Sequence, residues 1–171
     1  MKTLVVLFLI AVSPGIVFDQ SSPVPGGPQT LAGVWLLERV KSDFHAPTDA
    51  YKDQSIEIMV NGSELKLILT YVEKSKSVRS ERVLYSDNRG EVNKISFGQT
   101  EIDQKSKTKW KGSKLICEVS ETKTKDGSIF AQTQKYEISK DGLHLIQSVE
   151  NSLPFAPTGR TSTVFIYKRK P

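Results

Sequence analysis

The residue types that most often carry out catalysis are sparse in this chain of 171 residues. It has one cysteine, Cys117, and two histidines, His45 and His144, which are not spaced as metal ligands usually are. The sequence has no nucleophile elbow, phosphate-binding loop or dinucleotide-binding fingerprint. Cys117 lies in KLICEVS, with apolar residues nearby on both sides, which favours a buried, unreactive thiol. We therefore expect a protein without enzymatic activity, bound metal or cofactor.

A row of lysines is the second feature with chemical potential. In KSKTKWKGSK, strand alternation places four lysines on one face and Ser106, Thr108 and Trp110 on the other. The lysines are Lys105, Lys107, Lys109 and Lys111. They could contact an anionic surface weakly, although a solvated outer face that discourages edge pairing is the commoner role. A single inward aromatic among them does not favour nucleic-acid binding.

The N-terminal segment indicates export. Residues 1–18, MKTLVVLFLIAVSPGIVF, combine a charged Lys2, an apolar run and the helix breakers Pro14 and Gly15. The apolar run is shorter than the about 20 residues of a membrane span. We expect 1–18 to be a signal peptide and the protein to be periplasmic or extracellular. The net charge of +5 indicates a mildly basic surface and no particular partner.

The rest of the chain divides into a leader and one domain. Residues 19–30 are rich in Pro, Gly and Ser, which predicts a flexible leader. From residue 31 to 171 the pattern is alternation. Ile56, Ile58 and Val60 share one face before Asn61-Gly62, and Leu65, Leu67, Leu69 and Tyr71 share one face after it. Two alternating runs joined at Asn-Gly predict a β-hairpin.

Similar turn sequences separate the later alternating runs. They are Asp87-Asn88-Arg89-Gly90, Lys111-Gly112, Asp126-Gly127 and Asp141-Gly142. Eight to ten strands joined by tight turns predict an all-β, antiparallel up-and-down meander that closes into a single barrel. Only residues 41–53 leave room for a short helical turn. We expect a monomer.

Several motifs carry a family resemblance. They are LAGVW (31–35), KSDF (41–44), KWKGSKL (109–115), YEISKDGLHL (136–145) and VFIYKRK (164–170). Together they resemble the lipocalin-like (calycin) superfamily, and most closely its small exported bacterial barrels. The resemblance implies a barrel around a cavity for a small apolar molecule. It also implies that Trp35 packs against a basic residue of the last strand, for which Arg169 is best placed.

The inward faces define a predicted ligand site. Its members alternate with outward residues and combine aromatic, aliphatic and amide side chains. They are Trp35, Leu37, Arg39, Tyr71, Trp110, Phe130, Tyr136 and Gln147. Arg39 is either a counter-ion for a ligand carboxylate at the barrel mouth or a solvated residue at a strand end. The lumen itself could be an open cavity or a solid core whose amides pair with each other.

These observations favour an exported binding protein that holds a small hydrophobic or amphipathic, fatty-acid-like ligand in the barrel lumen. Two other functions stay open. The leader could be the tail of a secreted protease inhibitor, or the barrel could be a structural envelope or surface protein. Deleting residues 19–30 separates the first alternative from ligand binding.

Overall fold

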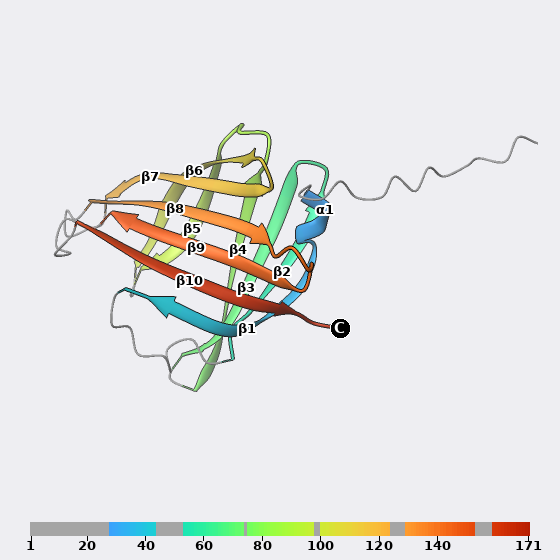
Figure 1. Cartoon of the computed structure of the whole chain (residues 1–171). Helices are drawn as coiled ribbons and strands as arrows, with labels where there is room; N and C mark the ends of the chain where they lie inside the picture. The colour runs from blue at the N-terminus through green and yellow to red at the C-terminus, as the bar shows by residue number, and fades with distance from the viewer. Residues whose placement is uncertain (1–27, 44–52, 74, 98–99, 124–128, 153–158) are drawn as a thin grey trace, which may run out of the picture.

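The computed structural model describes residues 28–43, 53–73, 75–97, 100–123, 129–152 and 159–171. These residues form one short helix and ten strands (Figure 1). The elements are α1 (Pro28–Leu31), β1 (Gly33–Ser42), β2 (Ser55–Asn61), β3 (Glu64–Glu73), β4 (Lys76–Tyr85), β5 (Glu91–Phe97), β6 (Thr100–Lys111), β7 (Lys114–Lys123), β8 (Ile129–Ile138), β9 (His144–Ser152) and β10 (Arg160–Arg169). Within these ranges no helix has the length and apolar character needed to cross a membrane.

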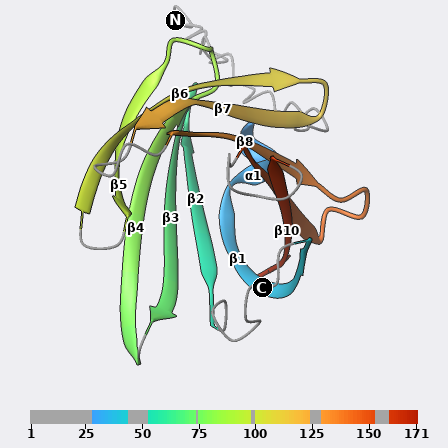
Figure 2. The same ribbon diagram turned by 90° about the vertical axis from the view of Figure 1, so that its left-hand side faces the viewer.

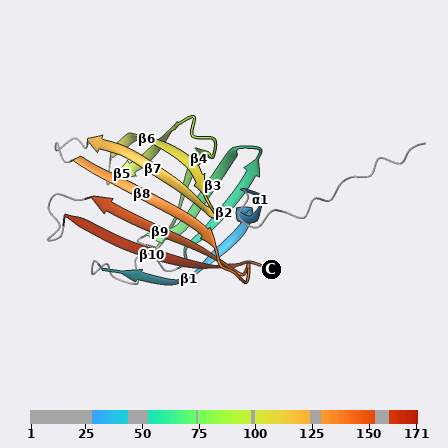
Figure 3. The same ribbon diagram turned by 45° about the horizontal axis from the view of Figure 1, so that its top comes forward.

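The ten strands form one antiparallel sheet in the order β4-β3-β2-β1-β10-β9-β8-β7-β6-β5. Strands that follow each other in the chain therefore pair, apart from β4 and β5. The first and last strands, β1 and β10, also pair with each other. Figures 2 and 3 show the sheet curving round until β4 and β5 face each other. The predicted all-β up-and-down barrel is confirmed, with ten strands.

The hairpin predicted at Asn61-Gly62 is also confirmed. Asn61 pairs with Glu64, so Gly62 and Ser63 are the two loop residues. Gly62 has a φ of 58°, and a positive φ at the first loop position is what a type II′ turn requires. The hairpin between β6 and β7 repeats this arrangement with Gly112, whose φ is 61°.

Alternation along the strands places the core as the sequence predicts. On β2 and β3, Ile56, Ile58, Leu65 and Leu67 are buried side by side in the barrel interior. On β6, Ser106 and Thr108 are buried as well, while the lysines that alternate with them lie on the outside. Burial of one face per strand is the main source of stability for such a sheet.

The Gly-x-Trp segment closes one end of the barrel. Trp35 is fully buried, and its indole Nε1 donates to the Leu31 carbonyl at 2.9 Å. The guanidinium of Arg169 lies 4.2 Å from the centre of the indole ring and donates to the Thr30 and Ala32 carbonyls. The expected contact between Trp35 and Arg169 is therefore confirmed, as a cation–π contact that also ties α1 to β10.

Gly33 is required at the start of β1 because of this packing. Its φ is 134°, and a Cβ there would lie 3.1 Å from Nη1 of Arg169. The sequence placed the domain boundary at residue 31, whereas the folded part already includes α1, so residues 28–30 belong to the domain. The rest of the predicted leader, and most of the 41–53 segment, lies outside the described residues.

Candidate functional site

A cavity of about 230 Å³ lies inside the barrel, between β2–β4 on one side and β8–β10 on the other. Its apolar lining consists of Ile56, Leu67, Leu69, Val149 and Phe165. Its polar lining consists of Ser80, Arg82, Gln132, Gln134, Tyr136 and Gln147. The volume has room for roughly seven water molecules at ~30 Å³ each. The lumen is thus not packed solid, although it lies below the ~300–1,000 Å³ of most ligand pockets.

The amides and the phenol that line the cavity belong to a continuous chain of hydrogen bonds, which extends beyond the lining at both ends. Gln54 Nε2 donates to the Tyr167 hydroxyl at 2.5 Å, and that hydroxyl donates to Gln147 Oε1 at 3.1 Å. Gln147 Nε2 then donates to the Tyr136 hydroxyl at 3.2 Å, and Tyr136 donates to Gln134 Oε1 at 2.6 Å. Each phenol therefore accepts one hydrogen bond and donates another.

The same chain continues toward the other end of the barrel. Gln134 Nε2 donates to Gln132 Oε1, and Gln132 Nε2 donates to Asn151 Oδ1 at 2.7 Å. Asn151 Nδ2 contacts Thr161 Oγ1 at 3.4 Å. Every bond in the chain runs in the same donor direction, an arrangement in which successive bonds polarise and strengthen each other.

Burial sets the protonation state of the phenols and the thiol. Desolvation raises the pKa of Tyr136 and of Tyr167 well above the ordinary tyrosine value. Both phenols are thus neutral donors at physiological pH. Desolvation also raises the pKa of Cys117, and the predicted burial of this side chain is confirmed.

Arg82 is the one charged side chain among the residues that line this cavity. It extends from β4, the strand that ends the sheet. Its charge acts on the Tyr136 phenol of β8 and the Cys117 thiol of β7. Within the described ranges Arg82 makes no hydrogen bond and no ion pair.

The structure places two of the predicted site residues in the cavity lining, Tyr136 and Gln147. Trp35 is in the core at the closed end, and Leu37 and Trp110 are half-buried against the core. Tyr71 is half-buried on β3. None of these four lines the cavity. The side chain of Phe130 lies outside the described residues.

Arg39 is a correction, because its side chain is exposed and takes no part in the cavity. Leu37 pairs with Tyr167, whereas Arg39 pairs with Ile166, the next residue along β10. A β-bulge therefore inserts Glu38 and shifts the alternation. The strand pattern alone could not reveal an extra residue at this point.

The other nine lining residues were absent from the predicted site: the five apolar ones and the polar Ser80, Arg82, Gln132 and Gln134. A sequence signal for Arg82 existed, because it alternates with Leu84, whose apolar side chain is buried. A charged residue two positions before an apolar inward residue shares its face. Gln132 and Gln134 share a face of β8 with Tyr136 in the same way.

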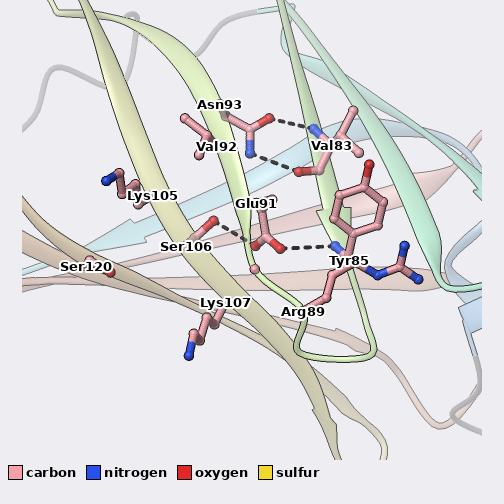
Figure 4. Close-up of a pocket in the computed structure, with 11 residues that line it drawn as sticks. Val83, Tyr85, Arg89, Glu91, Val92, Asn93, Lys105, Ser106, Lys107 and Ser120 are labelled. Carbon is pink, nitrogen blue, oxygen red and sulfur yellow. Dashed lines mark hydrogen bonds between the residues drawn. The ribbon is translucent and has the colours of Figure 1, made fainter.

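The junction between β4 and β5 is closed by side chains. Asn93 accepts a hydrogen bond from Val83 N at 2.7 Å and donates to Val83 O at 2.9 Å, as a paired strand residue would (Figure 4). Glu91 accepts one from Tyr85 N at 3.2 Å, and Ser106 donates to its other oxygen at 2.7 Å. No main-chain pairing joins β4 and β5 among the described residues.

An outer groove of about 770 Å³ follows this junction. Lys105 and Lys107 lie along it and have no ion pair within the described part of the chain (Figure 4). Three lysines farther along the same outer surface do have one: Lys109 with Glu118, Lys114 with Glu137, and Lys135 with Glu150. These pairs neutralise part of the predicted basic surface, which weakens the case for a polyanion partner.

No protein family and no curated protein matches the sequence. Solved structures do match the fold. The wild-type fluorescent protein UnaG superposes with a TM-score of 0.53 at 15% identity, over 84% of this chain and all (100%) of its own. A secretory abundant heat soluble protein from Ramazzottius varieornatus gives 0.53 at 16% identity, over 82% of this chain and 96% of its own. The chain has the lipocalin-like barrel fold.

Secretory abundant heat soluble protein 4 from the same organism gives a TM-score of 0.51 at 12% identity, over 85% of this chain and 97% of its own. Identities this low establish the shared barrel and nothing about ligands. The lipocalin-like fold expected from the motifs is therefore confirmed.

Proposed function

We propose that this chain is an exported, non-enzymatic protein that binds a small hydrophobic or amphipathic, fatty-acid-like molecule in the barrel lumen. The observation that carries the proposal is the cavity, whose lining combines aliphatic and aromatic residues with a hydrogen-bonded amide–phenol row. Such a lining matches a molecule with an apolar body and a polar end.

The fixed polar side of the cavity supports binding rather than catalysis. Its members are three amides, one neutral phenol, one serine hydroxyl and the Arg82 guanidinium, which orient a ligand but do not act as nucleophiles or general bases near neutral pH. In the described part of the chain no group of three or more His, Cys, Asp or Glu side chains could hold a metal ion. Export is supported by the composition of residues 1–18.

The cavity volume limits the size of the ligand. About 230 Å³ suits a short or medium-length acyl chain better than a long one, unless the residues that line the cavity move apart. We therefore expect affinity to pass through a maximum as acyl chain length increases, with dissociation constants in the micromolar range, or about −8 kcal/mol.

Binding in the lumen can be tested with a pair of serines on β4. Ser80 lines the cavity, whereas Ser77 on the same strand is exposed. We expect Ser80→Trp to abolish uptake of a fluorescent fatty acid because the indole fills the cavity, and Ser77→Trp to leave uptake unchanged. Native mass spectrometry of the protein purified from its own host should show a bound small molecule. A clean unliganded mass together with no uptake by the wild-type protein would contradict the proposal.

The two alternatives give different results in one further experiment. Removing residues 19–27, which precede α1, leaves a lumen-binding protein active but destroys an inhibitor that uses its tail. A purely structural protein shows neither ligand uptake nor protease inhibition before or after the truncation. The mass of the secreted protein also tests cleavage of the predicted signal peptide.

A further inference from the structure

The charge on Arg82 has no partner of opposite sign at hydrogen-bonding distance within the described residues, although its half-buried side chain lines the cavity. The charges of Glu91 and Arg82 both act on the Cys117 thiol, but no ion pair joins the two side chains. The Glu91 oxygens already accept bonds from Ser106, Thr108 and Tyr85 N. A guanidinium facing a low-dielectric cavity is costly unless an anion accompanies it.

The surroundings of Arg82 offer mostly hydrogen-bond donors. Gln132, Gln134 and Gln147 each use one N–H of the side-chain amide in the hydrogen-bonded row. Each amide nitrogen carries two hydrogens, so a second N–H remains on each. The hydroxyl of Ser80, two residues from Arg82 on β4, lines the same cavity. A ligand group placed here can therefore accept several hydrogen bonds.

We propose that Arg82, together with Ser80 and the glutamine amides facing it, forms an anion subsite that receives the carboxylate of the bound molecule. The subsite lies on the β4 side of the lumen, and the apolar part of the ligand then packs against Leu67, Leu69 and Phe165. A carboxylate matches the paired N–H groups of a guanidinium better than an alcohol or ester does. This inference rests on the proposed function and names the chemical class of its ligand.

The test compares three probes with the same acyl chain: decanoic acid, methyl decanoate and decylamine. We expect the wild-type protein to prefer the acid. Arg82→Met should weaken the acid by roughly tenfold to a hundredfold, the range for a charged hydrogen bond, and leave the ester within about twofold. Arg82→Lys should retain part of the preference because it keeps the charge but loses the paired geometry.

Arg39 provides the matched control, because it is an exposed arginine outside the cavity. Arg39→Met removes the same charge from the protein and should leave all three affinities unchanged. Equal weakening of the acid by both variants would show a general electrostatic effect and overturn the subsite.

The remaining outcomes separate the subsite from the proposed function. If the wild-type protein binds acid and ester equally, the subsite is wrong and lumen binding stands. If no probe binds and Ser80→Trp changes nothing, lumen binding itself fails. We also expect Arg82→Met to fold with equal or higher stability without ligand, because it removes a charge without a close partner. A large loss of stability would instead assign Arg82 a structural role.

Discussion

Where β1 meets β10, seven residues of each strand are register partners, from Trp35 with Arg169 to Ser42 with Thr163. Where β4 meets β5, the strands are joined in the described ranges by hydrogen bonds between the main chain of β4 and the side chains of Asn93 and Glu91. One closure consists of main-chain groups that every residue possesses. The other depends on two particular side chains.

This difference determines how strongly a side-chain substitution can weaken each of the two closures. A main-chain ladder survives most side-chain changes, so its weak point is the packing that holds it, above all Trp35. The β4–β5 junction loses hydrogen bonds as soon as Asn93 or Glu91 changes. Arg82 belongs to β4, so the proposed anion subsite borders the junction rather than the ladder.

The largest effect is expected from breaking the packing at the ladder. Trp35→Ala should lower the free energy of unfolding by about 3–5 kcal/mol, because it leaves a large cavity in the core. It also removes the ring under Arg169 and the donor to Leu31. Urea denaturation gives the value, with Trp110→Ala as the control.

Trp110 is the other tryptophan of the chain and is half-buried on β6, away from the ladder. Its Nε1 is buried without a hydrogen-bond partner among the described residues, so its removal should cost less. Equal losses for the two variants would mean that the ladder end has no special importance for stability.

The ladder and its packing are also the part that the sequence predicts best. The Gly-x-Trp motif locates the closed end. The alternation of Ile56, Ile58 and their neighbours on β3 locates the core, because the burial of alternate residues depends only on local sequence. Arg39 shows the limit of such local prediction. One inserted residue reverses the faces beyond it, and its position depends on pairing with β10.

The cavity and the junction are harder to predict because both depend on residues distant in sequence. Gln54, which precedes β2, and Thr161 belong to one hydrogen-bonded chain only after β8, β9 and β10 are brought together. Asn93 occupies the pairing position opposite Val83 only because the strands carrying them do not pair. Arg82 was predictable from Leu84 by alternation, but its charge argued for the outside.

Alkaline pH provides a second way to weaken the ladder and not the junction. Tyr167 pairs with Leu37 in the ladder, and desolvation raises the pKa of its phenol above the ordinary value of 10.0. The folded state therefore holds this proton more tightly than the unfolded chain does. Its contribution to stability is complete below pH 10 and declines as the pH rises above it, by up to about 1.4 kcal/mol per pH unit.

Tyr167→Phe removes this dependence. The variant should be less stable at pH 7, because Gln54 and Gln147 lose a partner, and its stability should fall less steeply than that of the wild type above pH 10. Urea denaturation at pH 7, 10 and 11 measures both slopes. Parallel curves for the two proteins would show that Tyr167 does not resist ionisation in the folded state.

The smallest effect is expected at the junction, where the outer groove lets water reach the strand edges. Asn93→Ala removes both hydrogen bonds to Val83, but water that enters the groove can replace them. The free energy of unfolding should therefore fall by only about 1 kcal/mol, the lower end of the range for buried groups left without a partner. Asn93→Asp keeps an acceptor for Val83 N but loses the donor to Val83 O. Lys94→Ala, an exposed change on the same strand, is the control.

Hydrogen exchange locates the effect more sharply than stability does. In Asn93→Ala the amide of Val83 should exchange much faster, while the ladder amides of β1 and β10 keep their protection, because the two closures share no side chain. Asn93→Asp should lie between Ala and the wild type at Val83. Faster exchange throughout β1 and β10 in Asn93→Ala would contradict this expectation. It would mean that the side-chain junction and the main-chain ladder open together as one cooperative unit, although they differ in structure.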